Sequence, residues 1–597
     1  MNPLVLNIPP ALVFICGAFL IPLLRGRIKT AYMLMLPVLA FVIILQIPEG
    51  RHWTFSMVNL DLILGRIDRL SRIFGYIFTL VSFIAMLFAL NVDDDVQHIS
   101  GFVYAGGALG VTFAGDLFSL YIFWEIMAVA SAFLILARRT PEAQSAAFRY
   151  VLVHIFGGLC LLAGIIFYFQ KTGSLEFDFI GLSGPAGWLI FIGIALNAAI
   201  VPLHPWLQDA YPEATVTGAV FLSAFTTKSA VYLMARTFPG TELLIWLGVL
   251  MTAAPIFYAV LENDIRRVLA YSLINQVGFM MCGIGIGTPL AINGTVSHAF
   301  SHILYKALLF MAAGSVLHVT GKIRCTDLGG LYRTMPLTCL FCIIGAASIS
   351  AFPVFSGFIS KSMIISAAAH HHMALVWLIL QFASAGVFHH AGIKVPYFMF
   401  FGHDAGLPAR EPPLNMLMAM GLAAFLCVFI GIFPGMLYDL LPYTVHYIPY
   451  TAAHVVGQLQ LLMFGALAFC LLILSGKYPP EIRAINLDTD WFYRKGAGFI
   501  YALADRVLNG INRICDNVFA GTLPRLLSRF AGNASMWIVL GLLVPVRFFV
   551  RGNNFSPDHM GKRLEAIFES GTVPLGISVV LAVTFLAGVM ILSMLTG

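Results

Sequence analysis

Long apolar runs recur along most of this 597-residue sequence. A helix that crosses about 30 Å of hydrocarbon needs about 20 apolar residues. Clear examples of such runs are Leu12–Leu24 with its flanks, Phe74–Leu90, Leu243–Val260, Leu414–Ile432 and Leu575–Leu595. Only 10% of the residues are charged, against about 25% in a soluble domain, so the chain cannot cover a water-facing surface. We expect an all-α polytopic membrane protein with about 14 to 16 transmembrane helices.

The basic residues predict an orientation. The first apolar run has no charged residue before it, and three basic residues follow it at positions 25–29. This order is the reverse of a secretory signal peptide. The positive-inside rule then places the N-terminus outside and the first loop in the cytoplasm. Arg138–Arg139 and Arg266–Arg267 fall in loops on the same predicted side of the membrane. Such loops explain the net charge of +6 without a nucleic-acid partner.

Two hydrophobic segments are interrupted by helix-breaking residues. One is "VPLHPWLQDAYPEATV" at Val201–Val216, and the other is "ISAFPVFSGFISK" at Ile349–Lys361. Proline removes a helical donor, and such breaks occur at membrane depth only where protein or water satisfies the freed backbone. Two broken helices in corresponding halves indicate a transporter built from inverted repeats.

The C-terminal part of the sequence has a different pattern. Between Ala497 and Phe530, apolar residues recur at helical spacing, while Arg506 and Arg513 share another face. This pattern predicts an amphipathic helix that lies along a membrane or protein surface, although an ordinary interfacial linker would have a similar sequence. Two apolar runs follow, the short Ala531–Val546 and the longer Val573–Leu595.

Several ionisable residues stand inside apolar stretches. Twelve uncharged residues follow Glu125 before the next charge, and the nearest charge before it is nine residues back. A charge at the bilayer centre costs about 2.5–3.5 kcal/mol or more, so such groups usually face the interior of the bundle. The candidates that share this setting are Glu125, Lys228, His298, His302, Lys306, Lys361 and Lys394.

His298, His302 and Lys306 are spaced by four residues, which places them near one helix face. Imidazole can both donate and accept a proton near neutral pH, so the row predicts a proton relay. Glu125 is the candidate carboxylate partner of Lys228. Each group also has a simpler interpretation: Glu125 as part of a structural ion pair, His298 as a core histidine, and Lys394 as a lysine whose amine extends to the membrane surface.

Cofactor-binding patterns are missing from the sequence. It carries no nucleotide-binding or haem-attachment motif, and we expect neither a cofactor nor a metal. Cys339 and Cys342 form a C-x-x-C pair in an apolar helix without a second ligand pair, which favours small buried hydrophobes. The cluster His370–His372 has the composition of a loop.

Five stretches together resemble one family. They are "FWEIM", "VPLHPWLQDAYPEAT", "DIRRVLAYSLINQVGF", "HAFSHILYKALLFMAAGS" and "FSGFISK", in that order. They resemble the antiporter-like proton-translocating subunits of respiratory complex I and of Mrp-type cation/proton antiporters (the D or A type), over about residues 70 to 400. The resemblance implies two inverted five-helix repeats, each with a broken helix, and the amphipathic stretch resembles the lateral helix of the long members.

The resemblance also implies roles for single residues. Glu125 matches the acidic residue of the first half-channel, and Lys228 matches the bridging lysine. The relay of the second half corresponds to His298, His302 and Lys306, and Lys361 matches the ionisable residue of the second broken helix.

Two positions depart from the family pattern. Asn197 stands where the family has a lysine that partners the glutamate, and Gln208 replaces a proline. An amide cannot take up and hold a proton near neutral pH. The first half-channel is therefore either silent, or Lys228 becomes the direct partner of Glu125.

The resemblance implies an ion-translocating subunit of a multisubunit complex I-like or Mrp-type complex in the inner membrane of a prokaryote. It would move H⁺, with Na⁺ as a second candidate ion, and would have other membrane subunits as partners and no catalytic site of its own. The alternative is a transport-silent scaffold subunit of a membrane redox complex such as a hydrogenase or oxidoreductase. We expect N-terminal helices in 1–95, the antiporter-like core in 96–400, further transmembrane helices in 401–476, and the amphipathic and final helices in 477–597.

Overall fold

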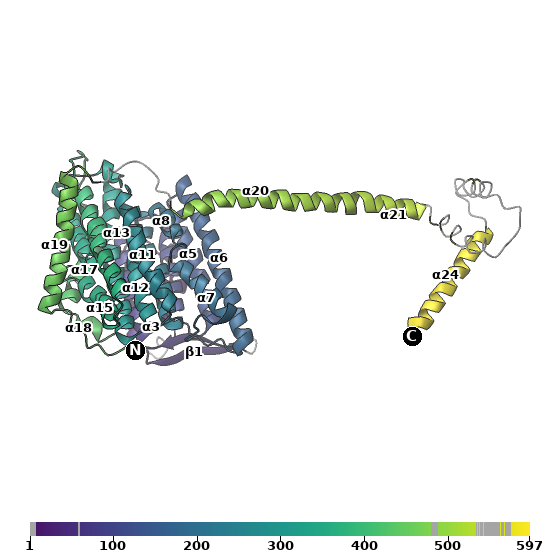
Figure 1. Ribbon diagram of the computed structural model, residues 1–597, viewed down its shortest axis with the longest axis horizontal. Coiled ribbons are helices and arrows are strands. Elements are labelled where there is room, and N and C mark those ends of the chain that lie inside the picture. The colour runs from purple at the N-terminus through teal and green to yellow at the C-terminus, as the bar shows by residue number, and fades with distance from the viewer. Residues whose placement is uncertain are drawn as a thin grey trace. The chain divides into compact units, whose positions relative to one another are not determined.

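The computed structural model describes residues 8–57, 60–478, 488–532 and 575–596, with a few single residues between 534 and 566. The chain divides into two compact units, Met1–Asp490 and Trp491–Gly597. The first unit is a bundle of helices packed side by side, with a small hairpin at one end (Figure 1). This division of the chain does not test the four functional parts expected from the sequence, which remain a prediction.

The first part of the bundle contains a two-stranded antiparallel sheet and ten helices. Their bounds are α1 (Pro10–Ala18), α2 (Gly26–Gln46), β1 (Gly50–Met57), β2 (Leu60–Ile67), α3 (Arg69–Ala89), α4 (Asp95–Phe113), α5 (Leu117–Leu136), α6 (Pro141–Thr172), α7 (Gly184–Asn197), α8 (Pro205–Ala210), α9 (Val216–Ala224) and α10 (Thr226–Thr237).

The second part of the bundle continues with helices alone. They are α11 (Glu242–Leu261), α12 (Ile265–Ile286), α13 (Pro289–Thr320), α14 (Pro336–Ile349), α15 (Ser356–His370), α16 (Ala374–Val387) with the π-helical segments η6 (Phe388–Lys394) and η7 (Tyr397–Phe401), α17 (Leu414–Ile432), α18 (Gly435–Tyr438) and α19 (Ala452–Leu474).

Eleven helical stretches in the described residues are long and apolar enough to cross a membrane. The number is below the 14 to 16 spans expected because some crossings are made of shorter pieces. The two expected breaks are confirmed: α7 and α8 are separated at 198–204, and α14 and α15 at 350–355. At each break one alanine has a positive φ, 55° at Ala199 and 57° at Ala351. The chain therefore interrupts both helices with the same backbone device.

Matching features recur along the chain at a constant spacing of 148 residues. The longest helices, α6 and α13, begin at 141 and 289 and end at 172 and 320. Both are preceded by a capping threonine, and both end at a glycine in the left-handed conformation. Isolated β-bridges join Asp116 to Glu176 and Asp264 to Arg324, again 148 residues apart. The structure therefore contains two related five-helix repeats, α4–α10 and α11–α16.

The two repeats run in opposite directions across the bundle. When each broken helix is counted as one crossing, α12 is the fifth crossing after its counterpart α5. An odd number reverses the direction, so the start of α5 and the start of α12 lie at opposite ends of the bundle. The inverted repeats expected from the sequence are confirmed.

Basic residues gather at the end of the bundle where α8 lies. Arg138 donates to the Pro212 carbonyl oxygen, with a nitrogen–oxygen distance of 2.7 Å, and Arg266 donates to the Tyr211 carbonyl oxygen at 3.1 Å. Lys29 pairs with Asp95 at the start of α4. The basic residues that the positive-inside rule places on one side of the membrane therefore lie at one end of the bundle.

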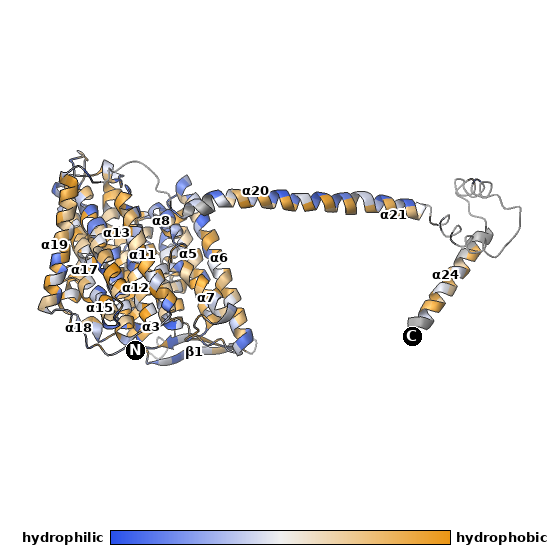
Figure 2. Cartoon of the chain, viewed as in Figure 1, coloured by the Kyte–Doolittle hydropathy of each residue, from blue (hydrophilic) through white to orange (hydrophobic). Residues whose placement is uncertain are grey.

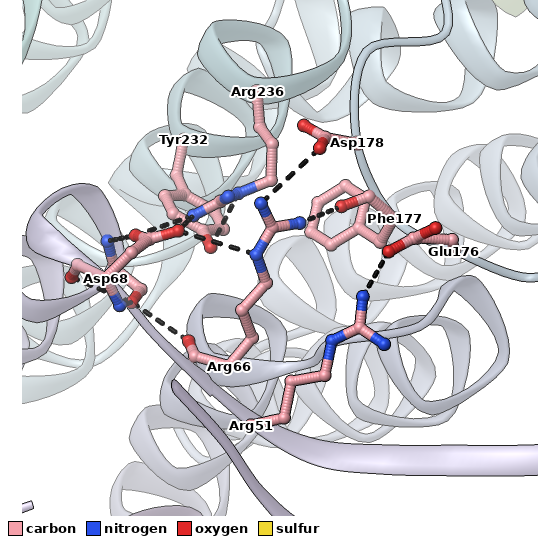
Figure 3. Close-up of polar contacts among 9 residues, drawn as sticks. Arg51, Arg66, Asp68, Glu176, Phe177, Asp178, Tyr232 and Arg236 are labelled. Atoms are coloured by element: carbon pink, nitrogen blue, oxygen red, sulfur yellow. Dashed lines mark hydrogen bonds and ion pairs between the residues drawn. The ribbon is translucent and has the colours of Figure 1, made fainter. Parts of the chain in front are cut away.

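A polar network ties the β-hairpin to the opposite end of the bundle. Arg236 of α10 pairs with Asp68, the capping residue of α3, at 2.8 Å, and also donates to the Tyr232 hydroxyl oxygen at 3.1 Å (Figure 3). Arg66 of β2 lies between Asp68 and Asp178 and donates to a backbone carbonyl oxygen of the segment after α6. These contacts fasten the hairpin, α3 and α10 to one another.

The second unit contains a long helical run and a final helix. The run comprises α20 (Asp490–Cys515), the π-helical segment η8 (Asp516–Thr522) and α21 (Leu523–Gly532), and the final helix is α24 (Leu575–Thr596). Apolar and polar residues alternate at helical spacing along α20 and α21 (Figure 2). The expected amphipathic helix is confirmed, whereas the apolar run 531–546 lies largely outside the described residues.

Candidate functional site

The predicted row on α13 is completely buried. His298, His302 and Lys306 each have 0% of their surface exposed. The ring centroids of His298 and His302 are 6.2 Å apart. His298 Nδ1 lies 3.1 Å from Ser360 Oγ of α15, and Lys306 Nζ donates to Ser272 Oγ of α12. The row therefore links α13 to α12 and to the second broken helix.

Two further lysines bond to backbone carbonyls at helix breaks. Lys361 Nζ donates to the carbonyl oxygen of Ile349, the last residue of α14, at 2.8 Å. Lys228 Nζ donates to the carbonyl oxygen of Ser223 at 2.7 Å, beside the junction of α9 and α10. A broken helix leaves carbonyls without their usual partners, and the C-terminal end of a helix attracts positive charge. Each break thus supplies a site for one buried lysine.

Lys228 belongs with the second half of the site. It lies close enough to His302 and Lys306 for their charges to interact. In the described part of the chain, neither Glu125 nor Lys228 forms an ion pair. Of the two alternatives, the structure does not show a direct pairing of these residues, because the amine of Lys228 is directed at the break in its own helix.

Glu125 lies at the margin of the bundle. Its side chain is half-buried on α5, and Oε1 has no hydrogen-bond partner among the described protein groups. The carboxylate rests against Gly158 of α6, where an added Cβ would stand only 2.1 Å from Oε1. On the other side Glu125 borders a largely apolar groove of about 550 Å³ between α4 and α5. The carboxylate therefore has access both to the interior of the first repeat and to a surface groove.

Asn197 ends α7 at the first break. Its side chain is 1% exposed, and neither amide atom has a hydrogen-bond partner among the described residues. A buried polar group without a partner costs about 1–3 kcal/mol, so the site favours ordered water. The amide can pass a hydrogen bond but cannot carry a proton.

A cavity of about 330 Å³ reaches Lys361 from one end of the bundle. Polar residues from the segment before α19 and from α19 itself line it, among them Tyr447, Thr451, His454 and Gln458. The second half of the site is therefore accessible at the broken helix.

Sequence reasoning gave His390 and Lys394 no role in the row. Both are completely buried on the π-helical segment η6. Lys394 Nζ donates to the Val260 and Glu262 carbonyl oxygens at 2.7 and 2.6 Å, at the C-terminal end of α11. These contacts exclude the interpretation of Lys394 as a surface-reaching lysine. His390 lies within electrostatic range of Lys306 and extends the buried row toward Lys394. The adjacent histidines His389 and His390, a few residues before Lys394, were the feature of the sequence that could have indicated this extension.

Gln208 has a specific partner that explains its place in α8. Its side-chain amide donates to Asp488 Oδ2 at 2.9 Å, and Tyr271 of α12 donates to the same oxygen at 3.0 Å. His204 Nε2 lies 3.3 Å from Asp488 Oδ1. Burial alone would raise the pKa of Asp488, but the hydrogen bond and charge of His204, with lesser help from Thr489 N–H and Gln208, lower it to about 2. We call this cluster the Asp488 clasp.

The described residues contain no cluster of three or more His, Cys, Asp or Glu side chains placed to hold a metal ion. The site consists of basic and neutral proton-carrying groups with one carboxylate at its edge.

Inverted five-helix repeats, a broken helix in each, and a buried row of ionisable residues between them define the architecture of inverted-repeat membrane transport proteins. Residues 114–387 match the family described as "NADH:quinone oxidoreductase/Mrp antiporter, TM". This region, somewhat less than half of the chain, is similar to that family.

Two curated relatives and one solved structure illustrate the similarity. The probable K⁺/H⁺ antiporter A/B subunit of Rhizobium meliloti is 30% identical over 400 residues, which cover 62% of this chain and 40% of the relative. The D-type subunit of the Na⁺/H⁺ antiporter of Alkalihalophilus pseudofirmus is 32% identical over 287 residues, which cover 45% and 58%. This chain thus spans about half the length of these relatives. A chain of the membrane-bound sulfane sulfur reductase, an archaeal respiratory membrane complex, has the same fold, with a TM-score of 0.69, 23% identity, and 90% and 99% coverage.

Proposed function

We propose that this chain is an ion-translocating membrane subunit of a multisubunit complex, and that it moves H⁺, with Na⁺ as a second candidate ion. The observation that carries the proposal is the buried row of His298, His302 and Lys306 with the buried lysines Lys228 and Lys361, and a cavity borders Lys361. Such groups are costly inside a membrane and mark ion paths. The names of the two antiporter relatives support an ion as the substrate.

The row suits the stepwise transfer of protons. His302 has no hydrogen-bond partner for either ring nitrogen among the described residues, and His298 has none for Nε2. Neutral imidazole accepts a proton at one nitrogen while the other can donate, so each ring can receive a proton on one side and release it on the other. Positive charge on Lys228 or Lys306 opposes a second charge on His302, and therefore the occupancy of one group controls that of the next.

The basic end of the bundle supports an orientation. If it faces the cytoplasm, as the positive-inside rule predicts, then the hairpin and the N-terminus face outside. The bacterial origin of the two antiporter relatives supports the inner membrane of a prokaryote as the location. Other membrane subunits are the partners that this proposal requires.

Lys306→Ala tests the proposal. The substitution keeps a helix-forming residue and removes one group from the middle of the row. In the intact complex reconstituted into vesicles, we expect ion-driven proton movement, followed with a pH-sensitive dye, to fall at least about tenfold. Lys322→Ala, at an exposed lysine beyond the end of α13, is the matched control. Unchanged flux in Lys306→Ala with normal yield of the complex would contradict the proposal.

A second candidate, a transport-silent scaffold of a membrane redox complex, is favoured by Asn197. The amide replaces the lysine that the resemblance leads one to expect, and without a protonatable group the first repeat would be inert. Full flux in both Lys306→Ala and Lys361→Ala, together with loss of assembly when this chain is omitted, would support the scaffold.

A further inference from the structure

The constant spacing of α6 and α13 assigns a counterpart to each residue of the buried row on α13. On α6 and α13, a shift of 148 residues superposes His154 on His302 and Gly158 on Lys306. The first repeat therefore carries an imidazole at the position of the central histidine of the second. In place of the lysine it has a glycine, and the carboxylate of Glu125 rests against that glycine.

The surroundings of His154 define its tautomer. The ring is 3% exposed, and Nδ1 lies 2.9 Å from the backbone carbonyl oxygen of Tyr150 one turn earlier. A carbonyl oxygen can only accept, so Nδ1 carries the hydrogen in the neutral ring. Nε2 then presents its lone pair, and it has no hydrogen-bond partner among the described residues. The ring is held on Tyr150 with a centroid distance of 3.9 Å, and it meets the edge of Trp206 at 4.7 Å.

His154 is level with Asn197 at the first break. The helices α6 and α7 touch closely there, since a Cβ added at Gly193 would stand 2.8 Å from the Gly157 carbonyl oxygen. Trp206, which meets the His154 ring, donates from Nε1 to the Leu196 carbonyl oxygen at 2.9 Å. The imidazole therefore lies beside the residue that the resemblance expects to be a lysine.

We propose that His154 is the proton-accepting residue of the first repeat and that it takes the role left open by Asn197. This inference rests on the proposed function. A proton leaves the carboxylic acid of Glu125 and binds the lone pair of His154 Nε2, directly or through water. The products are a carboxylate and an imidazolium, and the same proton later leaves Nε2 to restore the neutral ring.

A polar connection leads from His154 to Lys228, near the start of α10. The Tyr150 ring beneath His154 bonds through its hydroxyl to Ser131 Oγ at 2.8 Å and lies beside Thr226. Thr227, the next residue, accepts a hydrogen bond from Lys228 Nζ at 3.1 Å. His154 is therefore joined to Lys228 by side chains that can exchange hydrogen bonds.

Two aromatic side chains meet the ring of His154, Tyr150 of α6 and Trp206 of α8. One turn further along α6, Glu125 of α5 lies against Gly158. The helix α8 also carries the buried Asp209, which is paired with Arg149 of α6. Because Asp209 is held by this ion pair, Glu125 is the proton donor that we assign to Nε2.

The test compares His154→Gln with the double variant His154→Gln/Asn197→Lys in the reconstituted complex. We expect the single variant to lose at least about tenfold in proton flux, because glutamine keeps the hydrogen-bonding capacity but cannot hold the proton. The double variant should regain at least about half of the wild-type flux, since a lysine again stands beside Glu125. His318→Gln, at an exposed histidine in the last turn of α13, is the control.

Two results would overturn the inference while leaving the proposed function intact. One is normal flux in His154→Gln in a preparation where Lys306→Ala is inactive. The other is loss of flux without any rescue by Asn197→Lys, which would indicate a purely structural role. Infrared difference spectra with ring-labelled histidine give a readout independent of transport. An imidazole-to-imidazolium band on acidification of the wild-type complex, absent from His154→Gln, is expected, and identical spectra refute the inference.

Discussion

Replacing Asp488 with asparagine should loosen the Asp488 clasp. The carboxylate is held by His204, Gln208 and Tyr271, from both repeats of the bundle. Its pKa falls from the usual 3.8 to about 2 in spite of burial. Since a tenfold change in equilibrium corresponds to about 1.4 kcal/mol, this shift corresponds to roughly 2.4 kcal/mol, or an up to ~60-fold change in the population in which the clasp is open.

The sign of the pH dependence follows from the lowered pKa. A carboxyl whose pKa is depressed on folding contributes its full stabilisation above its ordinary value of 3.8, and this contribution disappears as the pH falls toward 2. At neutral pH the carboxyl of Asp488 is therefore ionised in the wild type. In Asp488→Asn the charge is missing at every pH, while the side-chain oxygen can still accept from Gln208 or Tyr271.

Hydrogen–deuterium exchange of the intact complex at pH 7 provides the assay. We expect peptides that contain residue 488 to exchange at least about tenfold faster in Asp488→Asn, with the ~60-fold figure as the upper limit. Asp439→Asn, at an exposed aspartate after α18, is the control. Equal exchange in the wild type and in Asp488→Asn would refute the reasoning, because it would mean that the charge of Asp488 does not hold this segment.

Two further substitutions test local contacts. Gly158→Ala places a Cβ 2.1 Å from Glu125 Oε1, so the carboxylate must move, and proton flux should fall several-fold at normal complex yield. The control is Gly457→Ala, where the added Cβ meets nothing within 4 Å and should have no effect. Equal flux in both variants would contradict the placement of Glu125. Arg236→Met removes the partner of Asp68 (Figure 3) and should lower the free energy of unfolding by about 1–3 kcal/mol, less than for a fully buried pair because Asp68 is one-third exposed. A thermal-melting curve checks this against the exposed control Arg69→Met, and equal melting temperatures would contradict it.

Most of the fold could be predicted from the sequence because lipid imposes a simple rule on it. Apolar runs of membrane length identify the spans, and prolines with glycines identify the two broken helices. The short pieces α7, α8, α14 and α15 were harder to count because a half-length helix satisfies no length criterion.

The site was only partly predictable. The spacing of four residues that unites His298, His302 and Lys306 is local, so the sequence shows it directly. The direction of Lys228 is not local, since it depends on which carbonyl is freed where α9 meets α10. For the same reason the sequence left open whether Glu125 is the direct partner of Lys228.

Two other residues escaped notice for different reasons. Asp488 meets Gln208 across 280 residues of sequence, and no short pattern links such positions. His154 lies 148 residues before His302, so its position could have been found from the repeat. The similarity between the repeats is visible, however, only once the structure shows the helix-capping residues and the isolated β-bridges.

The inverted repeats have a consequence for the direction of movement. Two identical copies in opposite orientations would present the same affinities to both sides of the membrane, and such a device would have no preferred sense. In this chain the duplicated segments have diverged: the triplet Tyr150, His154 and Gly158 stands in one copy where His298, His302 and Lys306 stand in the other. Because the copies differ, the two sides of the membrane are no longer equivalent. The difference between the copies therefore supplies the asymmetry that net movement in one direction requires.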